Sequence, residues 1–119
     1  MVEKRILVVE DEPDIRDLLC HVLRAEGYRV DGAATLAEAK SRLATARYSV
    51  VFADWRLPDG DGTVVAAWAK QLGAKTFVMS GYLFQMPGGR ALDHETLMKP
   101  LRPSEILDVV ERNIGKASV

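Results

Sequence analysis

The chain has 119 residues, of which 48% are hydrophobic and 28% are charged, and its formal net charge is −1. This composition is typical of a globular domain with one hydrophobic core, and we expect a single domain over residues 1–119. A net charge this close to zero gives no electrostatic reason to expect nucleic acid or an anionic membrane as a direct partner.

Cys20 is the only cysteine, which excludes an internal disulfide and is consistent with a reducing, cytoplasmic location. The first apolar run, residues 6–9, is too short for a membrane span, and the acidic residues after it do not fit a signal peptide. No linker, repeat or low-complexity tract divides the chain. We therefore expect any output domain to lie outside these residues.

Short apolar runs alternate along the chain with longer stretches of helical period. Runs that are apolar on both faces predict strands of a buried parallel sheet, and two weaker runs predict further strands near the sheet edges. In chain order, strands are expected at residues 5–9, 28–33, 48–53, 75–80 and 95–98.

Apolar residues at helical spacing predict the helices between these strands. Pro13 and Pro103 fall in first turns, where proline is tolerated, and Thr35 with Glu38 forms a capping box. A glycine follows three of the four apolar stripes, as is typical of helix ends. The stripes lie at residues 15–23, 36–43, 64–72 and 106–114.

The helical pattern fails between the fourth and fifth strands. The run Pro87-Gly88-Gly89 stands where a helix interior would be needed, and proline costs about 3 and glycine about 1 kcal/mol there. We expect a short or irregular fourth helix. The alternation as a whole predicts an α/β domain, doubly wound, with helices on both faces of a parallel sheet and a ligand site at the carboxyl ends of the strands.

Polar residues follow the strands at that edge. Glu10 and Asp11 follow the first strand, Asp54 the third, Ser80 ends the fourth and Lys99 follows the fifth. Carboxylates drawn together raise one another's pKa unless a cation intervenes, and a hard divalent ion such as Mg2+ fits oxygen ligands best. A carboxylate nucleophile, a metal, an ammonium and a hydroxyl are the parts required for phosphoryl transfer.

The stretches "ILVVEDEP", "DWRLPDGDG", "MSG" and "MKP" occur in one order over nearly the whole chain. Together they resemble the receiver domains of bacterial two-component response regulators. The resemblance implies a (βα)5 flavodoxin-like fold with a parallel five-stranded sheet of order 2-1-3-4-5. It also implies a Mg2+-dependent phosphoacceptor switch in a phosphorelay, which phosphorylates and dephosphorylates itself rather than turning over a substrate, and which changes partner binding.

The resemblance assigns a role to each of these positions. Asp54 would be the phosphoacceptor, receiving its phosphoryl group from a sensor histidine kinase or a histidine phosphotransfer protein. Asp11 and Asp54 would bind Mg2+, with Glu10 acting directly or through water, and Arg56 would contribute its main-chain carbonyl. We expect the neighbouring Trp55 to be semi-exposed and close to the metal.

The same resemblance assigns the phosphoryl contacts. Lys99 would contact Asp54 and then its phosphoryl group, and Ser80 would donate a hydrogen bond to it. Thr96 departs from the family pattern, because an aromatic residue is usual three positions before the lysine. Tyr82 is a candidate for its gating role. The downstream partner, the oligomeric state and whether the domain is part of a longer protein are left open.

Two other interpretations remain. A receiver-like domain that is not phosphorylated could serve as an interaction module. The stretch "DGDGTV" also resembles the nucleophile motif of haloacid dehalogenase phosphatases, which would make Asp59 the nucleophile. That chemistry needs its aspartate at the end of a buried strand, whereas Pro58 precedes Asp59 and lacks the donor that a central strand requires. Asp59 and Asp61 are better interpreted as turn residues.

Overall fold

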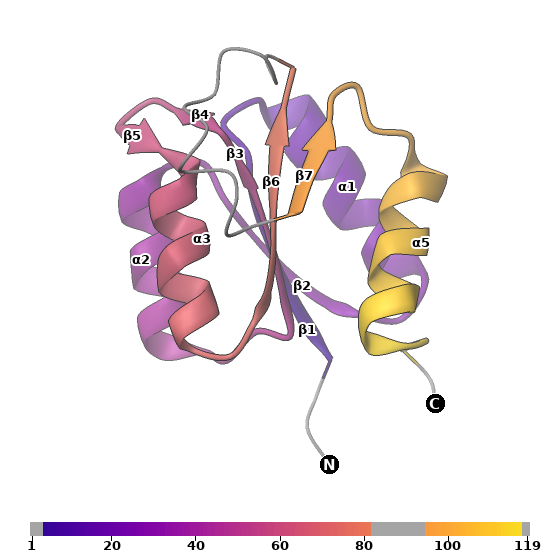
Figure 1. Cartoon of the computed structure of the whole chain (residues 1–119). Helices are drawn as coiled ribbons and strands as arrows, with labels where there is room; N and C mark the ends of the chain where they lie inside the picture. The colour runs from indigo at the N-terminus through magenta and orange to yellow at the C-terminus, as the bar shows by residue number, and fades with distance from the viewer. Residues whose placement is uncertain (1–3, 82–94, 118–119) are drawn as a thin grey trace.

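The computed structural model describes residues 4–81 and 95–117 (Figure 1). The expected short fourth helix and the gate at Tyr82 fall outside the described residues. The described elements are β1 (Arg5–Val9), α1 (Pro13–Ala25), β2 (Arg29–Ala33), α2 (Leu36–Thr45), β3 (Val50–Asp54), β4 (Arg56–Leu57), β5 (Gly60–Asp61), α3 (Gly62–Gln71), β6 (Lys75–Ser80), β7 (Glu95–Met98) and α5 (Pro103–Ile114).

Five of the strands form one parallel sheet in the order β2-β1-β3-β6-β7. This is the predicted order 2-1-3-4-5, and the doubly wound fold class is confirmed. Helices α2 and α3 cover one face of the sheet, and α1 and α5 cover the other (Figure 1). Strand β3 is therefore in the middle of the sheet, with two strands on each side.

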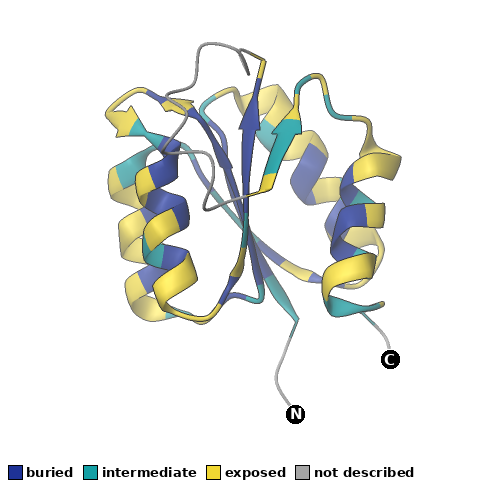
Figure 2. Ribbon diagram, viewed as in Figure 1, coloured by how far each residue is buried: buried dark blue, intermediate teal, exposed yellow. Residues whose placement is uncertain are grey.

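The core consists of two layers that the sheet separates. Along β1, Ile6 and Val8 pack toward α1 and α5, whereas Leu7 and Val9 pack toward α2 and α3, and all four are fully buried. On each helix the buried residues lie on the side that faces the sheet (Figure 2). The central strands β1, β3 and β6 contain buried apolar runs because both of their faces are covered, and these runs are what the sequence pattern identified.

The third strand ends one residue later than its apolar pattern indicates. It was expected at residues 48–53, but the ladder begins at Val50 and includes Asp54, which pairs with Met79. A carboxylate has low strand propensity, yet the backbone of Asp54 is fixed by its neighbour in the sheet. Asp54 is thus a strand residue rather than the first residue of a loop.

The segment after β3 folds into a two-stranded hairpin of β4 and β5, which the sequence pattern did not predict. Asp59 lies in the turn of this hairpin, in agreement with the turn residue expected there. Asp61 instead ends β5 and caps α3, because its carboxylate accepts hydrogen bonds from the main-chain N–H and the hydroxyl of Thr63.

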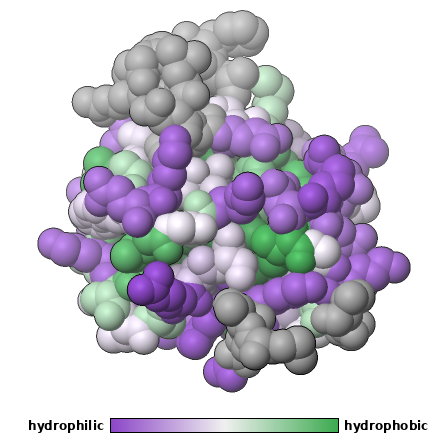
Figure 3. Space-filling model, turned by 60° about the horizontal axis from the view of Figure 1, so that its bottom comes forward, coloured by the Kyte–Doolittle hydropathy of each residue, from purple (hydrophilic) through white to green (hydrophobic). Residues whose placement is uncertain are grey.

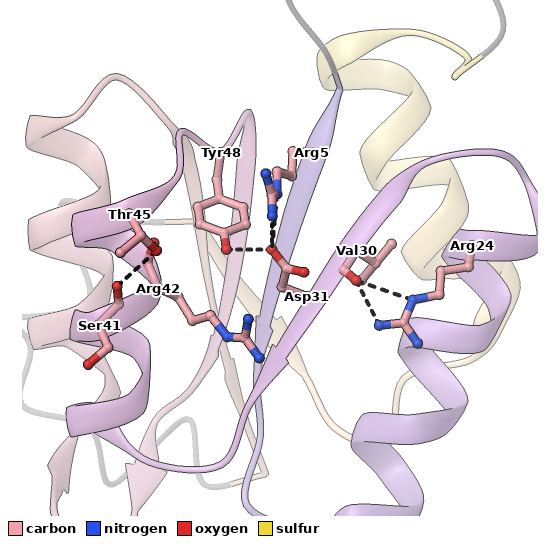
Figure 4. Close-up of polar contacts among 8 residues, drawn as sticks. All are labelled: Arg5, Arg24, Val30, Asp31, Ser41, Arg42, Thr45 and Tyr48. Carbon is pink, nitrogen blue, oxygen red and sulfur yellow. Dashed lines mark hydrogen bonds and ion pairs between the residues drawn. The ribbon is translucent and has the colours of Figure 1, made fainter.

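The edge strand β2 is tied to the rest of the domain by polar contacts (Figure 4). Asp31 accepts hydrogen bonds from the Tyr48 hydroxyl at 2.6 Å and from the Arg5 guanidinium at 3.0 Å. Arg24 donates two hydrogen bonds to the carbonyl of Val30. Partial burial of Asp31 raises its pKa, but the tyrosine and the arginine outweigh that effect and the net pKa is lowered.

An Asp31→Asn substitution is expected to reduce the free energy of unfolding by about 1–2 kcal/mol at pH 7, because Tyr48 and Arg5 would then donate to a neutral amide oxygen rather than to an ionised carboxylate. Since the folded-state pKa lies below the ordinary value, this contribution is present above about pH 4 and disappears as the pH falls through the folded pKa. Urea denaturation between pH 2.5 and pH 7 measures it. A difference between the two proteins that does not change with pH would contradict this account.

The surface at the amino ends of the strands is dominated by hydrophilic side chains, with apolar ones in separate small patches (Figure 3). Among the described residues, the large hydrophobic side chains that are exposed are Ile15, Leu18, Val64, Leu72 and Met98. None of the helices in the described part of the chain is long and apolar enough to cross a membrane.

Candidate functional site: an acidic pocket at the carboxyl edge of the sheet

The carboxyl ends of β1, β3, β6 and β7 meet at one edge of the sheet, the upper edge in Figure 1. A pocket of about 420 Å³ opens there, and the predicted residues gather around it. Glu10 is the exception, because it does not line the pocket but lies fully buried at its base. The lining residues are Asp11, Glu12, Asp54, Trp55, Arg56, Ser80, Gly81 and Lys99.

Lys99 is shared by two carboxylates. Its Nζ atom lies 2.5 Å from Oε1 of Glu10 and 3.2 Å from Oδ2 of Asp54. The second oxygen of Glu10 accepts a hydrogen bond from the main-chain N–H of Glu12 at 3.2 Å. A fully buried carboxylate is costly unless it is paired and hydrogen-bonded, and Glu10 meets both conditions.

The charges at the site shift the pKa values of its central pair. Burial, followed by the negative charge of Glu10, raises the pKa of Asp54 to about 7, although Lys99 opposes the shift. Burial lowers the pKa of Lys99, but the two carboxylates outweigh burial and the net pKa is raised. Lys99 is therefore an ammonium at neutral pH, and it alone does not compensate the cluster of acids around it.

The carboxylates are close enough to share one ion. Single oxygens from Glu10, Asp11 and Asp54 lie within 4.8 Å of one another. Oxygens bound to one Mg2+ at 2.0–2.1 Å are about 2.9 Å apart when adjacent and about 4.2 Å apart when opposite, so ion binding would draw the three oxygens closer together. The excess of negative charge, the oxygen donors and the open pocket together fit a hard divalent cation.

Trp55 differs from the expectation that it would be semi-exposed, because only 8% of its surface is accessible. Its ring packs with Ala66 and Val78, and the guanidinium of Arg56 lies 4.9 Å above the ring centroid. The turn from β3 into the hairpin directs the indole inward rather than toward solvent. Trp55 does line the pocket, as expected for a residue close to the metal site.

Ser80 and Thr96 lie on β6 and β7, the two strands that follow β3 in the sheet on the side away from β1. Ser80 ends β6 with only 2% of its surface accessible, and its carbonyl accepts the main-chain N–H of Lys99 at 3.0 Å. Thr96 pairs with Val78 and is half-buried. The main-chain hydrogen bond between Ser80 and Lys99 holds side by side the two backbone segments that carry the predicted hydroxyl and ammonium groups.

Gly62 is a functional residue that sequence reasoning missed. A Cβ atom at this position would lie 1.8 Å from the carbonyl oxygen of Asp54, and the Gly62 N–H donates to the Trp55 carbonyl at 2.7 Å. The backbone that holds Asp54 is thus in contact with the start of α3. Gly62 is the second glycine of "DGDG", and the motif alone suggests a turn residue. Only the folded chain shows that Gly62 lies against the backbone of Asp54.

Fold and site together define a doubly wound α/β domain with an acidic, metal-compatible pocket at the carboxyl edge of its parallel sheet. Residues 6–111 match the family described as the response regulator receiver domain. The chain belongs to this family, whose members act as phosphoacceptors in two-component signalling.

Several relatives at the sequence level are transcriptional regulatory proteins. The chain is 30% identical to the transcriptional regulatory protein ResD of Bacillus subtilis, over 98% of this chain and 50% of that protein. It is 39% identical to the phosphate regulon transcriptional regulatory protein PhoB of Escherichia coli, over 50% of this chain and 26% of that protein. The chain thus spans half or less of the length of these relatives.

Solved structures agree with this assignment over almost the whole chain. A CheY-like receiver domain protein from Methanospirillum hungatei superimposes with a TM-score of 0.85 and 30% identity, covering 93% of both chains. The response regulator TrrA from Thermotoga maritima, solved in complex with Mg2+-BeF, gives a TM-score of 0.82 and 32% identity, covering 93% of this chain and 99% of that one.

Proposed function

We propose that this protein accepts a phosphoryl group on Asp54 from a phosphohistidine, in a reaction that requires Mg2+. The observation that supports this most directly is the convergence of Lys99, Glu10 and Asp11 on Asp54 at the end of the central strand. A sensor histidine kinase or a histidine phosphotransfer protein is the proposed donor. We also predict that this domain does not contact nucleic acid directly. The relatives named above are transcriptional regulators, so this part of the prediction needs its own test.

Asp11, Asp54 and Glu10 would hold the metal, with the main-chain carbonyl of Arg56. Mg2+ bound there supplies positive charge that offsets the negative charge of the transferred group. Asp54 is the nucleophile, so its carboxylate must be ionised when it attacks phosphorus. The raised pKa of Asp54 makes this ionisation depend on neighbouring cations at neutral pH.

Lys99 and Ser80 have complementary roles in this proposal. The ammonium of Lys99 already contacts Asp54 and can move from the carboxylate to a phosphoryl oxygen without leaving Glu10. Ser80 donates a hydrogen bond to the phosphoryl group from the end of β6. A phosphoryl group adds about −1.5 to −2 charges at pH 7, which is the driving force for these two groups to close on it.

The phosphatase interpretation is disfavoured by the position of Asp59. Both of its carboxylate oxygens accept main-chain N–H groups at the start of α2, and Asp59 does not line the acidic pocket. The interaction-domain interpretation keeps the same fold without phosphorylation, so a chemical experiment must separate it from ours.

Incubation with acetyl phosphate tests the proposed function. With Mg2+, intact-protein mass spectrometry should show the addition of one phosphoryl group, and a chelator should abolish it. Borohydride converts the acyl phosphate to a reduced side chain, and peptide mapping should then place it at Asp54. Modification at Asp59 would support the phosphatase, and no modification with any small-molecule donor or phosphohistidine would support the interaction domain.

Mg2+ affinity is expected to fall about tenfold between pH 8 and pH 6, because a group with a pKa of about 7 must lose its proton to bind the ion. The sign follows from the raised pKa: protons compete with the metal below pH 7 and no longer compete above it. Titration followed by tryptophan emission measures the affinity at each pH. A constant affinity over this range would show that Asp54 remains ionised throughout.

A further inference from the structure

Asp59 forms a link between the hairpin and a helix that is distant in sequence. Its Oδ1 atom accepts the main-chain N–H of Leu36 at 2.8 Å, and its Oδ2 atom accepts that of Ala37 at 3.0 Å. These are free N–H groups of the first turn of α2, so Asp59 caps a helix that begins 23 residues before it. The two N–H groups lower the pKa of Asp59 and keep it ionised.

The helix does not depend on Asp59 alone for its cap. Thr35 is the N-cap of α2, and its hydroxyl accepts the main-chain N–H of Glu38 at 3.0 Å. The Thr35 cap lies on the same stretch of chain as the helix, whereas the Asp59 cap comes from the hairpin. Of the two caps, only that of Asp59 can therefore fix the hairpin relative to α2.

The hairpin is also held by packing at its turn. Leu57 is buried in the core cluster that Leu36 packs against. A Cβ atom added at Gly60 would lie 2.9 Å from the Cδ1 atom of Leu36, so the hairpin backbone rests directly on the start of α2. The turn end of the hairpin is thus fixed by a bidentate hydrogen bond and by close contact.

The other end of the hairpin forms one wall of the acidic pocket. Arg56 begins β4, lines the pocket with Trp55 and pairs with Asp61 across the hairpin. The guanidinium of Arg56 covers the Trp55 ring. Because β4 and β5 are only two residues long, little of their own pairing opposes a rotation of this wall.

We propose that Asp59 is a positioning residue for the pocket, which holds the hairpin against α2 and thereby keeps the Arg56 main chain and the Trp55 indole at the metal end of the site. This inference rests on the proposed function in one respect, because it takes the Arg56 main-chain carbonyl to be a metal ligand. It assigns a role to the acidic turn that is separate from the chemistry of Asp54.

The test compares Asp59→Ala with Thr35→Ala in a Trp68→Phe background, in which Trp55 is the only tryptophan. Both substitutions remove a cap from α2, but only the first releases the hairpin. We expect Asp59→Ala to weaken Mg2+ binding about tenfold, in the range typical of residues that orient metal ligands, and Thr35→Ala to leave it nearly unchanged. Asp59→Asn, which keeps one acceptor oxygen, should lie between the two.

The emission of Trp55 without metal provides a second readout. Asp59→Ala should shift it toward that of a more exposed indole, and Thr35→Ala should not. Urea denaturation shows whether the two variants lose similar stability. Equal effects of the two variants on Mg2+ affinity and on emission would overturn the inference. If the background protein shows no Mg2+ binding, the proposed function fails, and the metal-free emission alone decides the role of Asp59.

Discussion

An Asp54→Asn variant is expected to accept no phosphoryl group from acetyl phosphate and to give no tryptophan response to beryllofluoride in the presence of Mg2+. An amide has no anionic oxygen to attack phosphorus or to bind beryllium, so the loss should be complete rather than partial. Asp59→Asn is the matched control, since it makes the same chemical change in the neighbouring hairpin. At saturating Mg2+ it should retain both responses.

The same variant is expected to be more stable than the wild type when Mg2+ is absent. The folded-state pKa of Asp54 is about 7, whereas its ordinary value is 3.8, so the folded state binds more protons than the unfolded state between these values. Stability therefore falls as the pH rises from about 4 to about 7, and the full penalty, at most about 4 kcal/mol, is present above pH 7.

Urea denaturation at pH 5 and pH 8 in the presence of a chelator measures this effect. The stability gained by Asp54→Asn should be larger at pH 8, because asparagine does not ionise and Lys99 retains Glu10 as a partner. A variant that is less stable than the wild type at pH 8 would show that Lys99 stabilises the ionised Asp54 more than burial destabilises it.

A Gly62→Ala variant is expected to lose about 3 kcal/mol or more of unfolding free energy and to respond only weakly to Mg2+. The added Cβ atom would lie 1.8 Å from the carbonyl oxygen and 2.7 Å from the carbonyl carbon of Asp54. Both are main-chain atoms of the central strand, and they cannot move aside without disturbing the ladder to β6. The backbone that positions the phosphoacceptor must therefore shift.

The predicted loss of stability on Gly62→Ala is opposite in sign to the usual effect of replacing glycine by alanine in a helix. Gly62 is the first residue of α3, and within a helix alanine is normally favoured over glycine by about 1 kcal/mol. Gly32→Ala provides a control, because the nearest atom to its added Cβ, at 3.2 Å, belongs to the flexible side chain of Arg16. A neutral or stabilising Gly62→Ala substitution would contradict the close approach described above.

The sequence was sufficient to predict the fold because its central strands are buried on both faces. Continuous apolar runs such as residues 6–9 can be recognised without knowledge of their neighbours, and the order of the sheet followed from the family resemblance. The site was predictable for a related reason. Parallel strands bring their carboxyl ends to one edge, so the polar residue after each run marks the pocket.

Other features depend on contacts between distant parts of the chain, and no local pattern reports them. The two-residue strands of the hairpin are too short to show a period, and the cap that Asp59 provides joins residues 23 positions apart. Trp55 was expected to be semi-exposed because it follows Asp54 and should point away from the site, but Ala66, Val78 and the covering Arg56 bury it. Local sequence can identify chemical groups at the site, but it cannot determine how deeply each is enclosed.

The position of Asp54 on β3 also constrains how a signal can leave the site. β3 has a strand on either side and helices over both faces, and all five of its residues are buried. The backbone of β3 therefore cannot move easily when a phosphoryl group is attached to Asp54. The neighbouring strands and loops must move instead to make room for the added volume and charge. The edge strand β7 has no buried residue, so it is packed less tightly than β3. We therefore expect phosphorylation of Asp54 to displace β7 more than β6. Amide hydrogen exchange should become faster in β7 before it does so in the other strands.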